Sequence, residues 1–436
     1  MQKCRFIKIL WKFMQKKNKS IGSEMMDLIN DAWLKRRDII SDGFDESLEY
    51  ISKIVPLKIY KIPSGTKCWT WTIPEKWSVK DAFIKDMDGK EILNLKDHPL
   101  HIMSYSLPVN KVVDKKELLE HLHSRKDVPD AIPFEFKYYE RDWGFCIQHS
   151  KLKKINKNKY KVFIDSKFEK GDLKVGEYTI AGKSDETIIL VAHLCHPCQA
   201  NDDLAGVAVL VDVAKELIKQ NNYYTYKVLF VPETIGSIAY LSQNEQIISK
   251  LKYGIFFEML GNDNSLALQL SKQGNTKIDR IARYVMKKRL NKFREGKFRE
   301  IVRNDEMVFN GPGINVPMIS ISRFPYSEYH TSADNPKIIK EKNLEEAKDI
   351  ILEILKIVDK DYNPKRQFKG PVFLSGHGLW IDWRINKKLN QNIEQIMLKL
   401  EGDKSIFDIA EEMDMDFYDV LNYVDKFLEK KLIEKI

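Results

Sequence analysis

The sequence has no long apolar run, few cysteines and no internal repeat or low-complexity tract. No apolar stretch approaches the ~20 residues of a membrane-spanning helix, so we expect no such helix. The five cysteines of this 436-residue chain are scattered and odd in number, and no cleavable signal peptide is visible. These features predict a globular cytoplasmic protein with free thiols.

Clustered positive charge is also absent, apart from the first residues. The net charge of +9 is spread over lysine-rich runs, whereas a nucleic-acid-binding protein gathers its basic residues on one face. Residues 1–19 are the exception, with seven Lys or Arg, no acid, and apolar side chains on one helical face. Such a helix can lie on an anionic membrane or dock on the protein, and we favour docking.

Four apolar runs alternate with helical patterns between residues 174 and 358. The runs cover residues 187–194, 227–231, 253–259 and 316–322, and the helical patterns cover 204–220, 235–251, 278–290 and 343–358. The alternation predicts a three-layer α/β fold, in which a mixed, mostly parallel sheet has helices on both faces. A further helical segment is expected over residues 23–54.

The length and the changes in pattern predict several domains. They are a basic extension (residues 1–20), the α/β domain (21–60 and 169–365), an inserted β-rich domain (61–168) and a C-terminal module (370–436). Three short helical patterns and a final strand suggest that this last module is a winged helix. Between residues 401 and 436 eleven acids outnumber five bases, so we expect it to dock on protein and not on nucleic acid.

Polar side chains lie at the end of each of the four apolar runs or soon after it. In chain order they are His193 and Asp202, then Glu233, then Glu258, and finally Tyr329, His330 and Asp334. Parallel strands end at one edge of their sheet, so these groups are expected to converge there. Imidazoles and carboxylates around an open position suit a catalytic zinc, which lowers the pKa of a bound water to about 7. Glu258 is the strongest single signal, because an acid inside an apolar strand is costly unless it is paired or binds a metal.

With these residues in this order, the chain resembles the bacterial zinc aminopeptidases of metallopeptidase clan MH. More specifically, it resembles aminopeptidase-like proteins of unknown function that are often encoded near surface-polysaccharide genes and carry an inserted β domain and a C-terminal winged helix. The resemblance covers roughly residues 25–436. It rests on the segments AHLCHP (192–197), ANDDLAG (200–206), PETIGS (232–237), YHTSADN (329–335), IPSGT (62–66) and RDWGFC (141–146).

The resemblance implies a zinc exopeptidase-like fold and a role for each candidate residue. The implied metal ligands are His193, Asp202, Glu258 and His330. Asp202 stands where a carboxylate can bridge two ions, and Glu233 where the general base stands. Tyr329 matches a tyrosine whose hydroxyl can support the tetrahedral intermediate.

Two positions depart from the family pattern. The family has two adjacent acids, a base followed by a metal ligand, but here Thr234 occupies the second position. Cys195 replaces an aspartate that normally follows the first histidine by two places. The loss of a carboxylate weakens the second metal site, so we expect one zinc and leave open a second, weakly held one. For a single ion the expected ligands are Asp202, His193 and either Glu258 or His330. His196 could replace the missing ligand.

Three hypotheses about function follow. The first is a zinc-dependent amide or peptide hydrolase of the aminopeptidase type, with a small peptide or aminoacyl substrate and Glu233 activating the water. Asp305 or Glu328 could hold the substrate's free amine. The second is an amide hydrolase acting on amino-sugar or aminoacyl glycan precursors of surface polysaccharides. The third is a degenerate peptidase fold that binds a ligand or partner. The assembly state, monomer or homo-oligomer, is left open.

Overall fold

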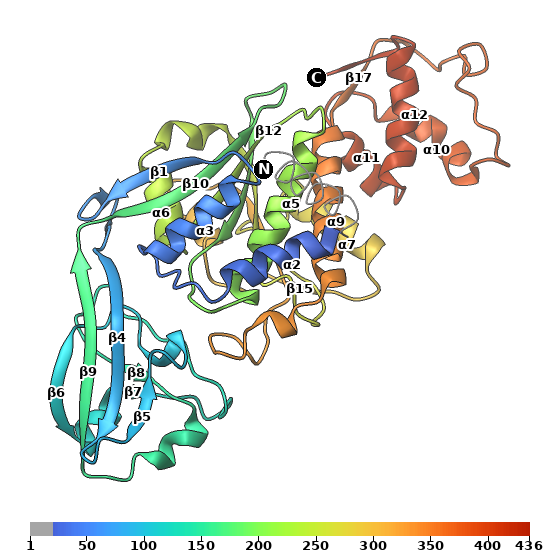
Figure 1. Ribbon diagram of the computed structural model, residues 1–436. Coiled ribbons are helices and arrows are strands. Elements are labelled where there is room, and N and C mark those ends of the chain that lie inside the picture. Colours follow the sequence, from blue (N-terminus) through green and yellow to red (C-terminus); the bar gives the residue numbers. More distant parts are fainter. Residues whose placement is uncertain (1–20) are drawn as a thin grey trace, which may run out of the picture. The chain divides into compact units, whose positions relative to one another are not determined.

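An eight-stranded sheet runs through the larger part of the computed structural model, which describes residues 21–436 (Figure 1). Its strands follow the spatial order β1 (Lys58–Pro63), β10 (Asp172–Ile180), β12 (Thr225–Val231), β11 (Thr187–His193), β13 (Leu251–Glu258), β16 (Met318–Ser322), β14 (Ala267–Gln269) and β15 (Arg294–Gly296). The four central strands, β12 to β16, are mutually parallel, and antiparallel pairs join β1, β10 and β14 to them. The predicted mixed, mostly parallel sheet is confirmed.

The central strands are apolar because both of their faces are covered. Every residue of β11 and of β16 is buried, as expected for parallel strands packed between helical layers. Helix α5 (Gly206–Ile218) connects β11 to β12, and α6 (Ile235–Ser242) begins the connection from β12 back to β13. These connections run in opposite directions along the sheet, so right-handed crossovers place α5 and α6 on opposite faces.

The other helices differ from the predicted ranges at their ends and, in one case, in number. Helices α7 (Lys277–Arg289) and α9 (Glu341–Lys360) match their predictions closely. The helix expected over 235–251 ends at Ser242, and a 3-10 turn (Glu245–Lys250) precedes β13. The helical segment expected over 23–54 consists of two helices, α2 (Ile21–Ala32) and α3 (Asp42–Ser52), with residues 33–41 between them. The Ser41 side chain accepts the N–H of Phe44 and so starts α3 as a separate helix.

Between β1 and β10 the chain forms a second, antiparallel sheet. Its strands lie in the order β5 (Glu91–Asn94), β4 (Lys76–Asp86), β9 (Lys159–Glu169) and β6 (Val109–Asp114). The long antiparallel strands β4 and β9 lie side by side, and β9 runs back to the main sheet, where β10 follows it directly (Figure 1). This sheet accounts for the β-rich character expected of residues 61–168, while the division into domains at those boundaries stays a prediction.

Chain contacts divide the described residues into two units, one up to residue 351 and the other from 352 to 436. The second unit contains α10 (Lys387–Leu398), α11 (Ile406–Glu412) and α12 (Phe417–Glu429), and its strand β18 (Ile433–Lys435) pairs with β17 (Pro364–Arg366). Three helices and a terminal strand match the predicted elements, and the winged-helix assignment stays a prediction. The predicted N-terminal extension and its membrane contact lie outside the described residues. From residue 21 onward, no helix is both long and apolar enough to cross a membrane.

Candidate metal centre

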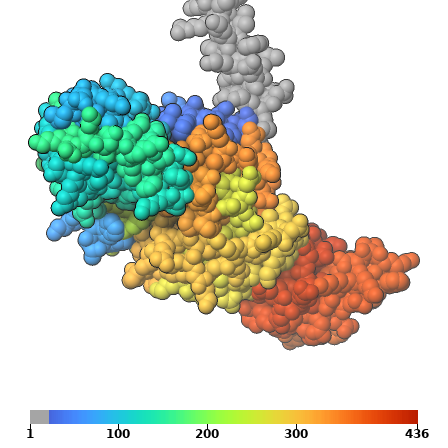
Figure 2. Space-filling model, turned by 90° about the horizontal axis from the view of Figure 1, so that it is seen from below, coloured from blue at the N-terminus to red at the C-terminus, as the bar shows by residue number. Residues whose placement is uncertain are grey.

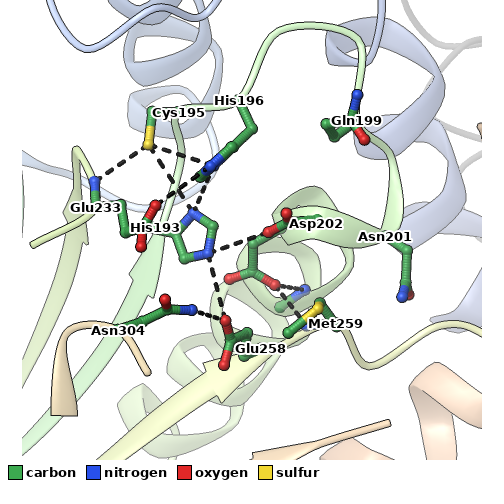
Figure 3. A network of polar contacts seen from close by, with 12 residues as sticks. His193, Cys195, His196, Gln199, Asn201, Asp202, Glu233, Glu258, Met259 and Asn304 are labelled. Carbon is green, nitrogen blue, oxygen red and sulfur yellow. Dashed lines mark hydrogen bonds and ion pairs between the residues drawn. The ribbon is translucent and has the colours of Figure 1, made fainter. Parts of the chain in front are cut away.

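The candidate site lies where the parallel strands end. His193 is the last residue of β11 and Glu258 the last of β13, while Glu233 follows β12 by two residues. Asp202 lies in a π-helical turn (Asn201–Ala205) just before α5, and His330 lies in the loop after β16. Because these strands share one direction, their ends bring the side chains together, as Figure 3 shows for His193, Asp202 and Glu258.

The Asp202 carboxylate lies between two imidazoles. Its Oδ1 is 3.3 Å from Nε2 of His193, and its Oδ2 is 3.0 Å from Nε2 of His330. His193 Nε2 is also 3.8 Å from Oε1 of Glu258. His193, Asp202 and Glu258 are buried, whereas 23% of the His330 side chain is exposed. The structure thus brings together all four predicted ligands, with one open side at His330.

Several polar atoms in this cluster have no hydrogen-bond partner within residues 21–436. They are Nε2 of His193, both carboxylate oxygens of Asp202, Oε2 of Glu258 and Nε2 of His330. Each such buried atom costs about 1–3 kcal/mol unless something else satisfies it. A divalent cation would satisfy them together, and a set of imidazole and carboxylate donors suits zinc. The residues present therefore fit a zinc site.

The charges of the cluster also call for a cation. Burial raises the pKa of Glu258 well above its ordinary range, and the His193 imidazole only partly opposes this. Burial acts in the same direction on Asp202, but His196, His193 and His330 together hold the pKa of that carboxyl well below its usual range. Two carboxyl groups this close remain ionised together only when positive charge lies beside them.

Asp334 holds the loop that carries Asp202. Its carboxylate accepts the backbone N–H groups of Ala200 (3.1 Å), Asn201 (2.6 Å) and Asp202 (3.1 Å), and the hydroxyl of Tyr326 (2.6 Å). The sequence singled out Asp334 as a polar residue near the site but gave it no role. The structure gives it a positioning role, because it fixes three successive peptide groups next to a ligand.

Asp203 ties the same loop to the strand that carries Glu258. Its Oδ1 accepts the N–H of Gly206 (3.1 Å) and that of Met259 (2.8 Å). Glycine is needed at 206, because a Cβ there would lie 2.3 Å from this oxygen. Asp202 and Glu258 are thereby held in register across two elements.

Arg37, which the sequence did not distinguish from Arg36, anchors the loop that follows His193. Its buried guanidinium donates to the carbonyl oxygens of Leu194 (2.9 Å), His196 (2.7 Å) and Gln199 (2.9 Å). Burial lowers the pKa of Arg37 to about 10, so it is charged at neutral pH. A rigid fork of donors can bind several carbonyl groups at once, which a lysine ammonium cannot do from one atom.

We expect Arg37→Lys to weaken zinc binding about 10- to 100-fold, because groups that orient metal ligands carry that much of the affinity. Calorimetric titration of the metal-free protein with zinc measures this change. Arg36→Lys is the matched control, since Arg36 donates to Pro99 and Ser104 and not to this loop. Equal zinc affinity in the two variants would contradict the positioning role of Arg37.

Glu233 lies beside the cluster and is more accessible than the predicted ligands His193, Asp202 and Glu258. Its Oε2 is 3.2 Å from Nε2 of His196, its backbone N–H donates to Sγ of Cys195 (3.1 Å), and 27% of its side chain is exposed. Burial works to raise the pKa of Glu233, but His196 outweighs that effect and lowers it. An ionised, partly exposed carboxylate next to buried imidazoles can accept a proton from water, as a general base must.

Tyr329 also reaches the cluster, while two other candidates are engaged elsewhere. The Tyr329 ring stacks on that of His330 with centroids 3.9 Å apart, and burial raises the pKa of its hydroxyl, which stays a donor. Asp305 Oδ1 accepts the N–H of Thr234 (3.0 Å) and the hydroxyl of Ser237 (2.5 Å). Glu328 accepts the hydroxyl of Ser327 next to it (2.8 Å). Binding of a substrate amine by Asp305 or Glu328 stays a prediction.

The segment between β1 and β10 places Phe134 beside two imidazoles of the cluster, and we call this side of the site the Phe134 wall. The sequence did not single out this residue. The Phe134 ring meets those of His196 and His330 edge-on, with centroids 5.3 and 5.4 Å away, and its N–H donates to the carbonyl of His330 (2.9 Å). Ile132 and Ser332 exchange two further hydrogen bonds. In Figure 2 this cyan and green segment adjoins the orange one that follows β16. Sequence reasoning missed the Phe134 wall because it depends on contacts between residues about 200 positions apart in the chain.

Comparison with known proteins identifies the family. A family model described as a domain of unknown function, DUF4910, matches residues 26–361. The chain belongs to this family. A protein of Clostridium acetobutylicum is 32% identical to this DUF4910 chain over 426 residues, which are 95% of this chain and 97% of that protein. That relative is described, provisionally, as a polysaccharide biosynthesis protein with an aminopeptidase-like domain.

Solved structures show the same fold. A crystal structure from Clostridium acetobutylicum, provisionally described as a peptidase, is 32% identical, has a TM-score of 0.85 and covers 95% of this DUF4910 chain and 96% of its own. A zinc aminopeptidase from Bacillus subtilis has a TM-score of 0.57 at 13% identity and covers 77% of this chain and 95% of its own. An aminopeptidase from Aneurinibacillus sp. strain AM-1 has a TM-score of 0.51 at 14% identity, with coverages of 77% and 93%. The similarity to the zinc aminopeptidase fold is confirmed.

Proposed function

We propose that the protein is a zinc-dependent amide hydrolase of the aminopeptidase type. The observation that carries this proposal is the group of buried imidazole and carboxylate atoms of His193, Asp202, Glu258 and His330 that make no hydrogen bond within residues 21–436, with the Glu233 carboxylate next to them. When bound, zinc would supply a Lewis acid that polarises a carbonyl and makes water more acidic. The aminopeptidase-like fold supports the same activity.

In the proposed reaction Glu233 moves the proton. Its carboxylate takes a proton from the attacking water as the oxygen bonds to the amide carbon, and then passes it to the nitrogen as the C–N bond breaks. The Tyr329 hydroxyl, kept protonated, can donate to the carbonyl oxygen as negative charge develops there. The Phe134 wall limits the access of water beside the two imidazoles.

The substrate we propose is a small aminoacyl amide or peptide with a free amino group. An aminoacyl or amino-sugar precursor of a surface polysaccharide is a second candidate. The name of the relative from Clostridium acetobutylicum, which refers to polysaccharide biosynthesis, favours it. Both candidates require the same bond to break, so they differ in the leaving group and not in the mechanism.

The test is hydrolysis of matched substrates by metal-free and zinc-loaded protein. Aminoacyl 4-nitroanilides, their N-acetylated counterparts and aminoacyl amides of glucosamine form the panel. We expect cleavage only with zinc, and at least tenfold slower cleavage of N-acetylated substrates. Faster cleavage of the glucosamine amides would favour the second candidate. Failure to bind zinc at all would overturn the proposal and leave a binding protein.

A further inference from the structure

The position where the family pattern has its second acid offers no carboxylate in this chain. Thr234 stands there, at the start of α6, with φ at +59° and its N–H bound to Asp305. The oxygen of Asp202 that faces His330 therefore lacks the third ligand which that acid would provide. Any ion on this side of Asp202 needs a donor from another segment.

His196 lies in the place from which such a donor can come. It follows His193 by three residues in a loop whose backbone Arg37 holds through the His196 carbonyl, and its φ of +80° turns the imidazole inward. The side chain is 2% exposed. Its ring centroid lies 5.0 Å from that of His330.

Two ligand groups therefore share the Asp202 carboxylate. One consists of His193, Asp202 and Glu258, and the other of His196, Asp202 and His330, and in each the ligand atoms lie within 4.8 Å of one another. His193 Nε2 faces Oδ1 of Asp202, and His330 Nε2 faces Oδ2, so the carboxylate has one oxygen for each group.

We infer that His196, together with Asp202 and His330, holds a second zinc ion, with the imidazole replacing the missing acid. This inference rests on the proposed function, since it assumes that the first group binds zinc. Zinc accepts imidazole as readily as carboxylate, so the exchange preserves the number of ligands while removing one negative charge. The second ion is then expected to bind more weakly than the first.

A thiolate site is the competing arrangement. Cys195 Sγ lies 3.5 Å from Nδ1 of His196 and 4.0 Å from Nδ1 of His193, so these three residues also form a potential group. An ion there would take Nδ1 of His193, whereas Nε2 of His193 faces Oδ1 of Asp202 and Oε1 of Glu258. Cys195 Sγ also accepts the N–H of Glu233. The geometry favours the group that contains His330.

Zinc content measured by mass spectrometry at saturating zinc tests the inference. We expect two ions per chain in the unmodified protein and in Cys195→Ala, but one in His196→Ala, His196→Gln and His330→Ala. Circular dichroism shows which variants are folded, and His196→Gln retains a polar side chain if alanine is not tolerated. Cobalt substitution adds a second readout, because a thiolate ligand would produce a sulfur-to-cobalt charge-transfer band.

The outcomes separate this inference from the proposed function. One ion in the unmodified protein, two ions in folded His196 variants, or a charge-transfer band that disappears in Cys195→Ala would each overturn the second site while leaving the hydrolase proposal standing. No zinc in the unmodified protein would overturn both.

Discussion

Glu233→Gln is expected to lower kcat for the amide substrate about 10³-fold, the usual contribution of a positioned general base. Glutamine keeps the size of the side chain and can still face His196, but it cannot accept the proton of the attacking water. Because Glu233 is a proton carrier in the proposed mechanism and not a metal ligand, zinc content and KM should change little. Steady-state kinetics on zinc-loaded protein measure the effect.

The matched control for this prediction is Glu245→Gln. Glu245 is an exposed acid in the turn after α6, where it accepts the indole N–H of Trp69. The same change of charge there should leave kcat within twofold of the starting value. A Glu233→Gln enzyme that retains most of its kcat would show that another group carries the proton. Loss of zinc in that variant would make Glu233 a ligand instead.

Asp202→Asn is expected to have the second large effect, on zinc affinity. Apparent zinc binding energies of about 10–16 kcal/mol over four ligands correspond to roughly 3–4 kcal/mol per ligand, or on the order of 10²- to 10³-fold in Kd. Each oxygen of Asp202 faces an imidazole. In the Asn variant one of these oxygens becomes an NH2 group, which cannot bind a cation. The thermal stabilisation that zinc confers should fall accordingly.

Asp212→Asn separates this effect from the general cost of altering a buried acid. Asp212 is buried on α5 and pairs with Lys215 and Lys348, away from the metal ligands. We expect it to lower the melting temperature without changing the zinc Kd. Zinc titration and thermal melts with and without zinc measure both quantities. Unchanged zinc affinity in Asp202→Asn would remove Asp202 from the ligand set.

The main sheet could be predicted because its central strands carry their signal locally. β11 and β16 are apolar throughout, since parallel strands are covered on both faces, and a polar residue marks the point where β11 ends. Short strands such as β14 and β15 have three residues each and were not predicted. The helical segment predicted over 23–54 did not show the break at residues 33–41, after which the Ser41 cap starts α3.

The site could be predicted only as a set of candidates. His193, Asp202, Glu258 and His330 were chosen from the ends of apolar runs and from the family pattern, and the structure brings them together. The sequence did not show which of the candidate residues lie outside the cluster. Asp305 was a candidate for holding the substrate's amine, yet Thr234 and Ser237 engage Oδ1 of its carboxylate.

The sequence alone determined the type of sheet, the edge at which the polar groups meet and the kinds of donor available there, because these depend on periodicity and on strand direction. The tertiary structure decided which residues fix the loops that carry the candidate ligands at that edge. Arg37, Asp334 and Phe134 act through backbone groups or ring faces of residues far away in the chain, and such contacts leave no periodic pattern. It also decided that His196 faces the cluster, because a left-handed backbone turn sets the direction of that side chain.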